Sequence, residues 1–376
     1  MPMPPVPPVS RRGFLKAAGA GLAAGPLASR AARAQVRVPD PPGPKLGYAL
    51  VGLGSLAINQ LMPAFAKCEG SKLVAFVSGH REKAETLAAR YGVATKNIYN
   101  YENYDTIRDN PEVDVIYIVL PNGMHAEYTV RGLQAGKHVL CEKPMANSVA
   151  ECEQMIAAGR QADRKLMVAY RVHYEPFNRA LIKVARDQEF GRLRVVLADA
   201  GFPIGDPNQW RLKKQMAGGG SMMDIGIYAL NAARYLTGEE PVEVSAMEET
   251  TKGDPRFREV EENILFQLRF PSGVLANCTS SYGAPFNRFR VVGTDGWAEL
   301  EPASSYDGLR MRAGTWSRIE ERIISPVNHF AAEMDDFSSR IRNGEESPTP
   351  GEEGLKDMKI ITAIYQSVAS GAPVRL

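Results

Sequence analysis

The stretch "YALVGLGSLA", residues 48–57, decides the fold of this chain. An apolar run ends at Gly52, and Gly54 and Ala57 complete a Gly-x-Gly-x-x-Ala pattern. Glycines in these places let the chain turn tightly from a strand into a helix. They also let the backbone approach a pyrophosphate, whose charge then rests on the helix N-terminus. A strand-to-helix turn that binds no ligand would use the same glycines. The pattern of the surrounding sequence therefore has to decide between a nucleotide-binding turn and a plain one.

Apolar runs and amphipathic segments alternate through the first half of the chain. Unbroken apolar strands separated by helices are typical of a parallel, doubly wound sheet. This context favours a dinucleotide-binding turn over a plain one and predicts a Rossmann domain at residues 46–168. We expect strands at Gly47–Val51, Leu73–Val77, Val113–Leu120 and His138–Cys141, and helices at Ile58–Cys68, at Arg81–Tyr91 and from about His125.

The second half of the chain has a different pattern. Turn signals such as Pro271-Ser272-Gly273 between neighbouring apolar runs indicate a mainly antiparallel sheet. The predicted fold is therefore α/β, with the Rossmann domain followed by an α+β domain at residues 169–376 that holds a large open sheet. Strands are expected at Arg194–Asp199, Val242–Glu248, Asn263–Phe270, Val274–Ser281, Arg288–Val292 and Trp297–Glu301, and helices at Gly220–Leu236, Val327–Arg342 and Gly351–Ser370.

The N-terminus has the features of an export signal. Paired arginines in "SRRGFLK" (residues 10–16) precede an apolar, Ala/Gly-rich run, and Ala32-Arg33-Ala34 is a small-x-small cleavage site. The arginine pair resembles the twin-arginine signal, which exports proteins that have already folded. A plain secretory leader or a disordered basic tail would share parts of this pattern. We predict a twin-arginine signal peptide at residues 1–34, a Pro-rich arm at residues 35–45 and a periplasmic location.

The composition of the chain excludes several classes of partner. Lys plus Arg number 45 and Asp plus Glu 43, a balance that creates no single-signed field for nucleic acid or an anionic membrane surface. Outside the leader, no stretch approaches the roughly 18 consecutive apolar residues that a bilayer span needs. The expected partner is a small, uncharged molecule. Neither a metal site nor a disulfide framework is expected, because no CxxC pair or regular spacing joins Cys68, Cys141, Cys152 and Cys278.

The residues after the second predicted strand indicate which dinucleotide the chain would bind. NAD-binding chains usually place Asp or Glu at this strand end, where the carboxylate accepts hydrogen bonds from the ribose 2′-hydroxyl. This chain has Ser78 instead, followed by His80, Arg81 and Lys83. Hydroxyl and cationic donors suit a 2′-phosphate, so we predict NADP. Arg81 and Lys83 would also fit a solvated helix face, an interpretation that leaves the missing acid unexplained.

Three residues are candidates for the chemistry. Lys143, within Glu142-Lys143-Pro144, follows a strand at the carboxyl edge of the parallel sheet, where ligands of doubly wound folds bind. Asp224 and Tyr228 are spaced i and i+4 on one face of a helix, near its N-terminal end. A tyrosine ionises near pH ~10 in water, so it acts as a base at neutral pH only where a cation stabilises the phenolate. Lys143 could supply that charge, although each residue alone would also fit a structural role.

Six motifs extend from about Gly47 to the C-terminus. Besides the glycine turn with "GYAL", they are "LPNGMHAEY" (120–128), "CEKPM" (141–145), "YRVHYEP" (170–176), "QWRLKKQMAGGGSMMDIGIY" (209–228) and "PGEEGLKD" (350–357). Together they resemble the glucose–fructose oxidoreductase branch of the Gfo/Idh/MocA sugar dehydrogenase family. The resemblance implies that Lys143 and Tyr228 are catalytic, that Asp224 holds a sugar hydroxyl, and that the Lys143–Pro144 peptide is cis.

The same resemblance implies a set of binding residues. Ser78 and Lys83 would lie at the 2′-phosphate, Tyr101 near the adenine, and Trp210 and Arg211 over the cofactor. The residues predicted to bind NADP are Gly52, Gly54, Ser55, Leu56, Ala57, Ser78, Gly79, His80, Arg81, Lys83, Tyr101, Leu120, Pro121, Asn122, His125, Glu142, Lys143, Arg171, Trp210 and Arg211, and those predicted to bind the sugar are Lys143, Arg171, Asp224 and Tyr228.

The chain departs from that branch in the length of its N-terminal arm. In the branch a long arm covers the cofactor and reaches a neighbouring subunit, whereas here a short segment separates Ala34 from the first strand. A short arm disfavours a tetramer and disfavours fructose as the acceptor. The aldose–aldose oxidoreductases of bacteria fit the same residues, so a second aldose is the acceptor we expect, in a homodimer formed through the C-terminal sheet.

These implications predict a sugar oxidoreductase with tightly bound NADP. Tyr228 would take the C1 hydroxyl proton of an aldose while hydride passes from C1 to the nicotinamide, which gives a lactone, and the reverse steps would reduce a second sugar to an alditol. A chain folded around NADP before export could work where free NADP is absent. Two alternatives stay open: an aldose 1-dehydrogenase that exchanges NADP with solvent, and a non-catalytic periplasmic sugar-binding protein, against which the pair of Lys143 and Tyr228 argues.

Overall fold

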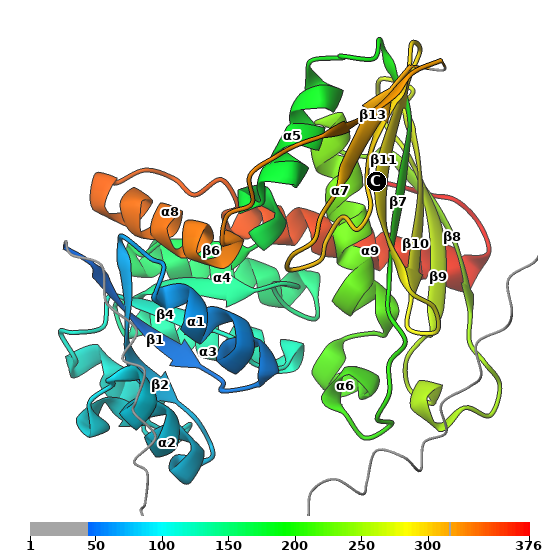
Figure 1. Ribbon diagram of the computed structural model, residues 1–376. Coiled ribbons are helices and arrows are strands. Elements are labelled where there is room, and N and C mark those ends of the chain that lie inside the picture. The colour runs from blue at the N-terminus through cyan, green and yellow to red at the C-terminus, as the bar shows by residue number, and fades with distance from the viewer. Residues whose placement is uncertain (1–43, 316) are drawn as a thin grey trace, which may run out of the picture. The chain divides into compact units, whose positions relative to one another are not determined.

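The glycine turn lies at the centre of a parallel sheet. The structure, a computed structural model, describes residues 44–315 and 317–376 (Figure 1). In these ranges one sheet has six strands, all parallel, in the order β3-β2-β1-β4-β5-β6. The turn follows the central strand β1 directly. The strands are β1 Leu46–Val51, β2 Ser71–Val77, β3 Ile98–Tyr99, β4 Val115–Ile118, β5 His138–Glu142 and β6 Leu166–Ala169.

Helices cover both faces of this sheet, because its strands carry apolar side chains on both sides. On one face Ile116 and Cys141 pack with α3 and α4. On the other face Leu50 and Tyr117 pack with α1, α2 and α8. The helices of the described residues are α1 Met62–Phe65, α2 Arg81–Tyr91, α3 His125–Gln134, α4 Val149–Ala162, α5 Pro176–Arg186, α6 Lys214–Ala217, α7 Ile227–Thr237, α8 His329–Asn343 and α9 Gly351–Ser370.

Helix α8 belongs to the C-terminal part of the chain and yet packs on the first sheet. Phe330, Met334 and Phe337 of α8 share a buried cluster with β1. The hydroxyl of Tyr48 in β1 donates to the backbone oxygen of Met334 at 2.9 Å. The chain therefore crosses back from the second sheet to the first, and the domain boundaries derived from the sequence stay predictions.

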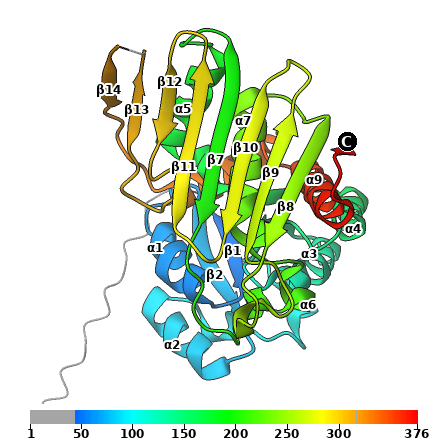
Figure 2. The ribbon, with the colours of Figure 1, turned by 90° about the vertical axis from the view of Figure 1, so that its right-hand side faces the viewer.

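The second sheet is mainly antiparallel, as the sequence predicts. Within the described ranges it has nine strands in the order β14-β13-β12-β11-β7-β10-β9-β8-β15, and β7 and β10 pair in parallel. Figure 2 shows this sheet in front, with α5, α7 and α9 behind it. Its strands are β7 Leu193–Gly201, β8 Glu243–Glu249, β9 Asn263–Arg269, β10 Leu275–Ser281, β11 Phe286–Gly293, β12 Trp297–Leu300, β13 Met311–Gly314, β14 Ile319–Arg322 and β15 Val374–Arg375.

Most expected elements are present, with two differences at helix starts. The helix expected at Gly220–Leu236 begins as a π-helix, η7 Met222–Gly226, and continues as α7. The helix expected at Ile58–Cys68 likewise begins as a π-helix, η1 Ala57–Leu61, before α1. A π turn adds a backbone residue without altering the apolar spacing enough to be read from sequence. Sequence analysis also missed α4, α5 and the short strands β3, β6, β13, β14 and β15.

Several expectations fall on the N-terminal segment. The predicted leader at residues 1–34 lies outside the described residues, and so does the predicted arm up to Gly43. In the part of the chain that is described, no helix combines the length and apolar character that crossing a membrane requires.

The start of η7 is held by Glu261 in a close backbone contact. The Glu261 carboxylate accepts from the backbone N–H of Gly220 at 2.7 Å and of Met222 at 3.0 Å. It also accepts from the hydroxyl of Tyr365 at 3.0 Å. A Cβ on Gly220 would lie 2.0 Å from the backbone oxygen of Glu261. Only glycine fits there, so the Gly-Gly-Gly segment sets where η7 begins.

Replacing this glycine should destabilise the fold. We expect Gly220→Ala to lower the free energy of unfolding by roughly 1–3 kcal/mol, because the added methyl group meets backbone rather than a movable side chain. Thermal unfolding followed by circular dichroism measures the change. Gly205→Ala is the matched control, since a Cβ there meets nothing within 4 Å. Equal midpoints for the two variants would contradict this account of the segment.

Candidate active site

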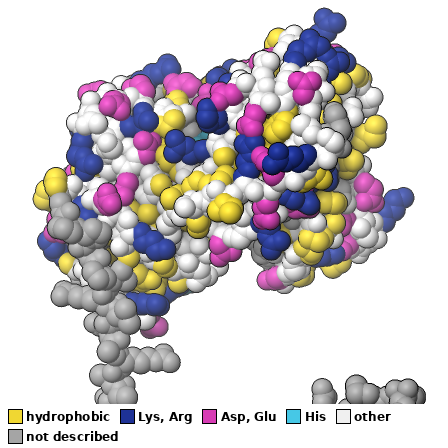
Figure 3. Space-filling model, turned by 45° about the horizontal axis from the view of Figure 1, so that its top comes forward, with side chains coloured by type: hydrophobic (Ala, Val, Ile, Leu, Met, Phe, Trp, Pro, Cys, Tyr) yellow, Lys and Arg dark blue, Asp and Glu magenta, His cyan; other side chains and the backbone are white. Residues whose placement is uncertain are grey.

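A cleft of about 1500 Å³ lies at the carboxyl ends of β1, β2, β4 and β5. Loops of the second sheet also line it, among them the loop between β12 and β13 that carries Tyr306. All but two of the residues predicted to bind NADP or sugar line this cleft, and the exceptions are Ala57 and Arg81. Lys, Arg, Asp and Glu side chains are interspersed over the face seen in Figure 3, in keeping with the balanced charge of the chain.

The glycine turn fits a pyrophosphate. Gly52 has φ +95°, and a Cβ there would lie 2.4 Å from the backbone oxygen of Val119, so the position requires glycine. A Cβ on Gly54 would meet nothing within 4 Å, because this backbone borders the open cleft. Ser55 and Leu56 line the cleft as well. Ala57 is fully buried beneath the turn and packs in the core, so its side chain does not line the cleft, and its assignment to the cofactor stays a prediction.

The end of β2 presents neutral and cationic groups to the cleft. The Ser78 hydroxyl oxygen accepts from the backbone N–H of His80 at 3.1 Å. Lys83 Nζ donates to the backbone oxygen of Leu53 at 2.5 Å, which draws the ammonium group to the glycine turn. Tyr101 covers Gly79, since a Cβ there would lie 3.1 Å from the ring. These contacts suit a ribose that carries a 2′-phosphate.

Arg81 does not join this group. Its Nε donates to Glu85 at 2.7 Å and its Nη1 to the backbone oxygen of Ile98 at 3.2 Å. Both contacts direct the guanidinium group along the outside of α2, away from the cleft. Arg81 therefore does not line the cleft, because an acid one turn further along the helix pairs with it, and its assignment to the cofactor stays a prediction.

His125 ties together two loops that border the cleft. One ring nitrogen lies 2.8 Å from the backbone oxygen of Leu120 and the other lies 2.9 Å from that of Pro144. Burial lowers the pKa of His125, so the neutral ring donates one of these two bonds. Asn122 donates from Nδ2 to the backbone oxygen of Ala217 at 2.9 Å, which joins this edge to α6. The Lys143–Pro144 peptide is cis, as the resemblance implies.

Lys143, Asp224 and Tyr228 come together in the cleft. Lys143 Nζ donates to the backbone oxygen of Asp224 at 2.6 Å and lies 3.6 Å from its Oδ1. The same nitrogen is 4.8 Å from the ring centroid of Tyr228. The i and i+4 spacing thus presents both side chains to one lysine, as predicted.

Asp224 is held as a carboxylate by the groups around it. Its Oδ2 accepts from Arg211 Nε at 2.9 Å and from the hydroxyl of Tyr282 at 3.0 Å. Burial alone would raise the pKa of Asp224, but Arg211 and Lys143 together bring it below its usual value. Arg211 also lies over the ring of Trp210, 4.6 Å from the ring centroid. The predicted pair of Trp210 and Arg211 therefore joins the cluster of Lys143, Asp224 and Tyr228 through Asp224.

A second cation lies beside Tyr228. The guanidinium carbon of Arg171 is 5.1 Å from the ring centroid of Tyr228 and 4.7 Å from that of Tyr306. Arg171 Nη2 donates to the backbone oxygen of Ser304 at 2.5 Å. Positive charge beside a phenol favours negative charge on its oxygen, so Arg171 supplements Lys143. Burial raises the pKa of Tyr306 to about 12, which leaves that hydroxyl protonated.

Two acidic side chains lie next to these cations. Glu142 accepts from the hydroxyl of Tyr117 at 3.0 Å, and burial raises the pKa of Glu142. Glu333 of α8 is fully buried, and neither carboxyl oxygen has a hydrogen-bond partner among the described residues. Burial and the charge of Glu142 raise the pKa of Glu333 well above its usual range. Burial therefore favours the neutral form of the Glu333 carboxyl group.

Sequence analysis missed the residues that loops bring to the cleft. Tyr306 lies between β12 and β13, and His329 and Phe330 begin α8; all three line the cleft. Tyr282 follows β10 and reaches the site through its hydrogen bond to Asp224. None of them belongs to a motif with a recognisable spacing. The one available signal was that Tyr282 directly follows a predicted strand. Among the described residues no cluster of three or more His, Cys, Asp or Glu side chains could hold a metal ion, and the four cysteines are buried.

Comparisons with known proteins identify relatives along almost the whole described chain. Residues 46–170 match a model described as "Oxidoreductase family, NAD-binding Rossmann fold", and residues 178–299 match the GFO/IDH/MocA C-terminal domain. The crystal structure of an aldose–aldose oxidoreductase from Caulobacter crescentus, complexed with glycerol, is 52% identical with a TM-score of 0.87. The match covers 88% of this chain and 100% of that one.

Two curated relatives are sugar dehydrogenases. A D-xylose 1-dehydrogenase [NADP(+)] of Haloarcula marismortui is 31% identical over 88% of this chain and 92% of its own length. A D-glucoside 3-dehydrogenase of Escherichia coli is 25% identical over 88% of this chain and 97% of its own length. These matches, together with the two domain models and the site described above, show that the chain belongs to the Gfo/Idh/MocA family of oxidoreductases.

Proposed function

We propose that this oxidoreductase holds NADP tightly, oxidises an aldose at C1 to the lactone and reduces a second aldose to an alditol. The observation that carries the proposal is the position of Tyr228, whose ring borders the cleft between Lys143 and Arg171. The similarity to the aldose–aldose oxidoreductase supports the choice of substrates, because the two chains share half of their residues over the full length of the relative.

The side chains of the cluster have distinct tasks in this reaction. Tyr228 takes the proton of the C1 hydroxyl in the first half and gives a proton to the carbonyl oxygen of the second sugar in the second half. Lys143 and Arg171 stabilise the phenolate, which is the form of Tyr228 before the first step and after the second. Asp224 Oδ1 accepts a hydrogen bond from a sugar hydroxyl, because Oδ2 is already held by Arg211 and Tyr282. NADP, when bound, accepts hydride from C1 and supplies it to the second sugar.

The residues at the end of β2 support NADP over NAD. Ser78 presents a hydroxyl group where NAD-binding chains present a carboxylate, and Lys83 adds a positive charge nearby. The glycine turn supplies backbone for the pyrophosphate. The same chemistry is consistent with the NADP-dependent xylose dehydrogenase among the relatives.

The predicted leader supports tight binding. A chain exported after folding would carry NADP from the cytoplasm into the periplasm, where no free NADP could replace it. If the cofactor does not exchange, oxidation of one sugar has to be matched by reduction of another. The second candidate is an aldose 1-dehydrogenase with exchangeable NADP, which the similarity to the xylose dehydrogenase favours.

Replacement of Ser78 tests the choice of nucleotide. We expect Ser78→Asp to weaken NADP binding by roughly tenfold or more, because the carboxylate repels the 2′-phosphate, and to strengthen NAD binding through the ribose hydroxyls. Dissociation constants for both nucleotides, measured by fluorescence titration, decide it. Ser317→Asp adds the same charge on an exposed turn and should leave both constants unchanged. Unaltered NADP affinity in Ser78→Asp would rule out this role.

Loss of the Tyr228 hydroxyl should slow both half-reactions. Tyr228→Phe keeps the ring between its two cations but removes the proton-transfer group, so the rates should fall roughly 10²- to 10⁴-fold with nucleotide binding retained. Stopped-flow absorbance of the reduced nicotinamide measures each half. Tyr235→Phe is the matched control, because its hydroxyl is on the same helix but bonds Glu353 at 3.3 Å. Sugar oxidation at a near wild-type rate in Tyr228→Phe would show that another group is the base.

The balance of products tests the proposal as a whole. With no nucleotide added, the purified protein and an aldose should yield aldonic acid and alditol in equal amounts, with ping-pong kinetics, because lactone has to leave before the acceptor binds. Chromatography of the products measures the ratio. Turnover that begins only after NADP is added would establish the dehydrogenase instead. Turnover that strictly requires fructose would show that fructose, and not a second aldose, is the acceptor.

A further inference from the structure

Arg171 and Tyr228 act together, yet they come from different sheets. Arg171 begins η5, the 3₁₀ turn Arg171–Tyr174, which follows the last strand of the parallel sheet. Tyr228 lies in the first turn of α7, which packs on the nine-stranded sheet. The distance of 5.1 Å between the guanidinium group and the ring therefore depends on how η5 is fixed against α7.

A carboxylate behind the cleft bonds both elements. Asp357 of α9 is buried, with 1% of its surface exposed. Its Oδ2 accepts from the hydroxyl of Tyr170 at 2.6 Å, and Tyr170 is the residue that precedes Arg171. The same oxygen accepts from Asn231 Nδ2 at 3.1 Å, and Oδ1 accepts from Arg234 Nη1 at 2.6 Å. Asn231 and Arg234 lie on α7, so one carboxylate joins η5 to α7.

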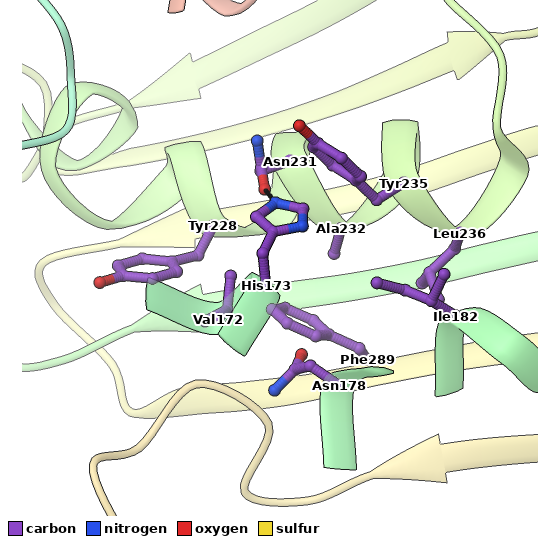
Figure 4. A pocket seen from close by; sticks show the side chains of 10 residues that line it. All are labelled: Val172, His173, Asn178, Ile182, Tyr228, Asn231, Ala232, Tyr235, Leu236 and Phe289. Carbon is purple, nitrogen blue, oxygen red and sulfur yellow. Dashed lines mark hydrogen bonds between the residues drawn. The ribbon is translucent and has the colours of Figure 1, made fainter. Parts of the chain in front are cut away.

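His173 supplies a second link between the same two elements. Burial lowers the pKa of His173 to about 4, so the neutral ring donates from Nε2 to Asn231 Oδ1 at 2.8 Å. Figure 4 shows His173 and Asn231 side by side at a pocket of about 20 Å³, and the Tyr228 hydroxyl points away from them. The bonded network thus lies behind the reactive face of α7 and touches no part of the cleft that Tyr228 presents.

Helix α9 is itself anchored to both sheets. Just before α9, Thr349 exchanges hydrogen bonds of 2.9 Å with Val168 in β6. Near the other end, Ser367 accepts from the backbone N–H of Ala246 in β8 at 2.9 Å. Asp357 is therefore fixed relative to β6, from which η5 continues, and relative to the sheet that supports α7.

We propose that Asp357 is a positioning residue, which sets Arg171 against the ring of Tyr228 by bonding Tyr170 on one side and Asn231 and Arg234 on the other. The inference rests on the proposed function, since it assigns a role in that reaction. Simple charge balance does not account for Asp357, because Arg234 also pairs with Glu240 at 2.7 Å and Glu353 at 2.8 Å. What Asp357 adds to these contacts is the bond to η5.

Asp357→Asn keeps the shape of the side chain but replaces one carboxylate oxygen by an amide group that donates. Tyr170, Asn231 and Arg234 all donate to Asp357, so at least one of their hydrogen bonds is lost. We expect kcat for sugar oxidation to fall about tenfold to a hundredfold, as for a misplaced catalytic group, while KM and the dissociation constant for NADP change by less than about threefold. Hydrogen exchange of the backbone amides of residues 171–174 should become faster, because η5 loses a bond to the scaffold.

Glu353→Gln is the matched control. Glu353 is also on α9 and also bonds Arg234, but among the described residues its side chain bonds neither Tyr170 nor any residue of η5. This variant should lose stability in thermal unfolding and keep kcat within about twofold of wild type.

Tyr170→Phe removes the other partner of the hydrogen bond between Tyr170 and Asp357, and it should lower kcat as Asp357→Asn does. In the double variant with Asp357→Asn it should add no further loss, because both changes break one bond.

Each result decides the matter. A wild-type kcat in both Tyr170→Phe and Asp357→Asn, or an equal fall of kcat in Glu353→Gln at equal loss of stability, would overturn the positioning role. Independent, multiplicative losses in the double variant would also overturn it. If Asp357→Asn does not fold, Tyr170→Phe with its hydrogen exchange still tests the link. Failure of the proposed function is distinct, since it would appear in the wild-type protein, which would then oxidise no aldose or would oxidise it only after NADP is added.

Discussion

Positive charge beside the ring of Tyr228 is the interaction on which the rest of the site depends. Lys143 and Arg171 each lie about 5 Å from the ring centroid. Both are held mainly by neutral backbone oxygens, those of Asp224 and Ser304, rather than by close carboxylates of their own. The Asp224 carboxylate lies 3.6 Å from Lys143, but its negative charge is shared with Arg211. The two cations therefore retain charge with which to stabilise a phenolate.

The same requirement explains the acids buried next to the cluster. If Glu142 and Glu333 were both ionised, they would compensate the very cations that Tyr228 needs. Burial raises the pKa of both, and Glu333 has no hydrogen-bond partner among the described residues. A neutral carboxyl group at this depth costs less free energy than an unpaired carboxylate would. Burial thus favours the form of these acids that leaves the positive charge of Lys143 and Arg171 uncompensated.

A site residue could be predicted from the sequence only where the contacts that place it are local in sequence. Gly52, Lys143 and Tyr228 were predicted, because a strand-to-helix turn, a strand end and an i, i+4 spacing each have a local pattern. Arg81 was predicted to bind the cofactor, whereas the structure pairs it with Glu85 and with the backbone oxygen of Ile98, and the second of these contacts is too distant in sequence to be foreseen. Tyr306 and Glu333 could not be found from sequence at all. Both reach the cluster through long-range packing, which leaves no periodic signal.

The packing of α8 on the first sheet has a consequence for the order in which the chain can mature. A nascent chain that has reached Ala169 contains every strand of the parallel sheet, but it lacks the helix that covers Tyr48, Leu50 and Tyr117. Until synthesis passes Asn343, only α1 and α2 can cover that face. The first half of the chain therefore cannot complete its core on the ribosome ahead of the rest.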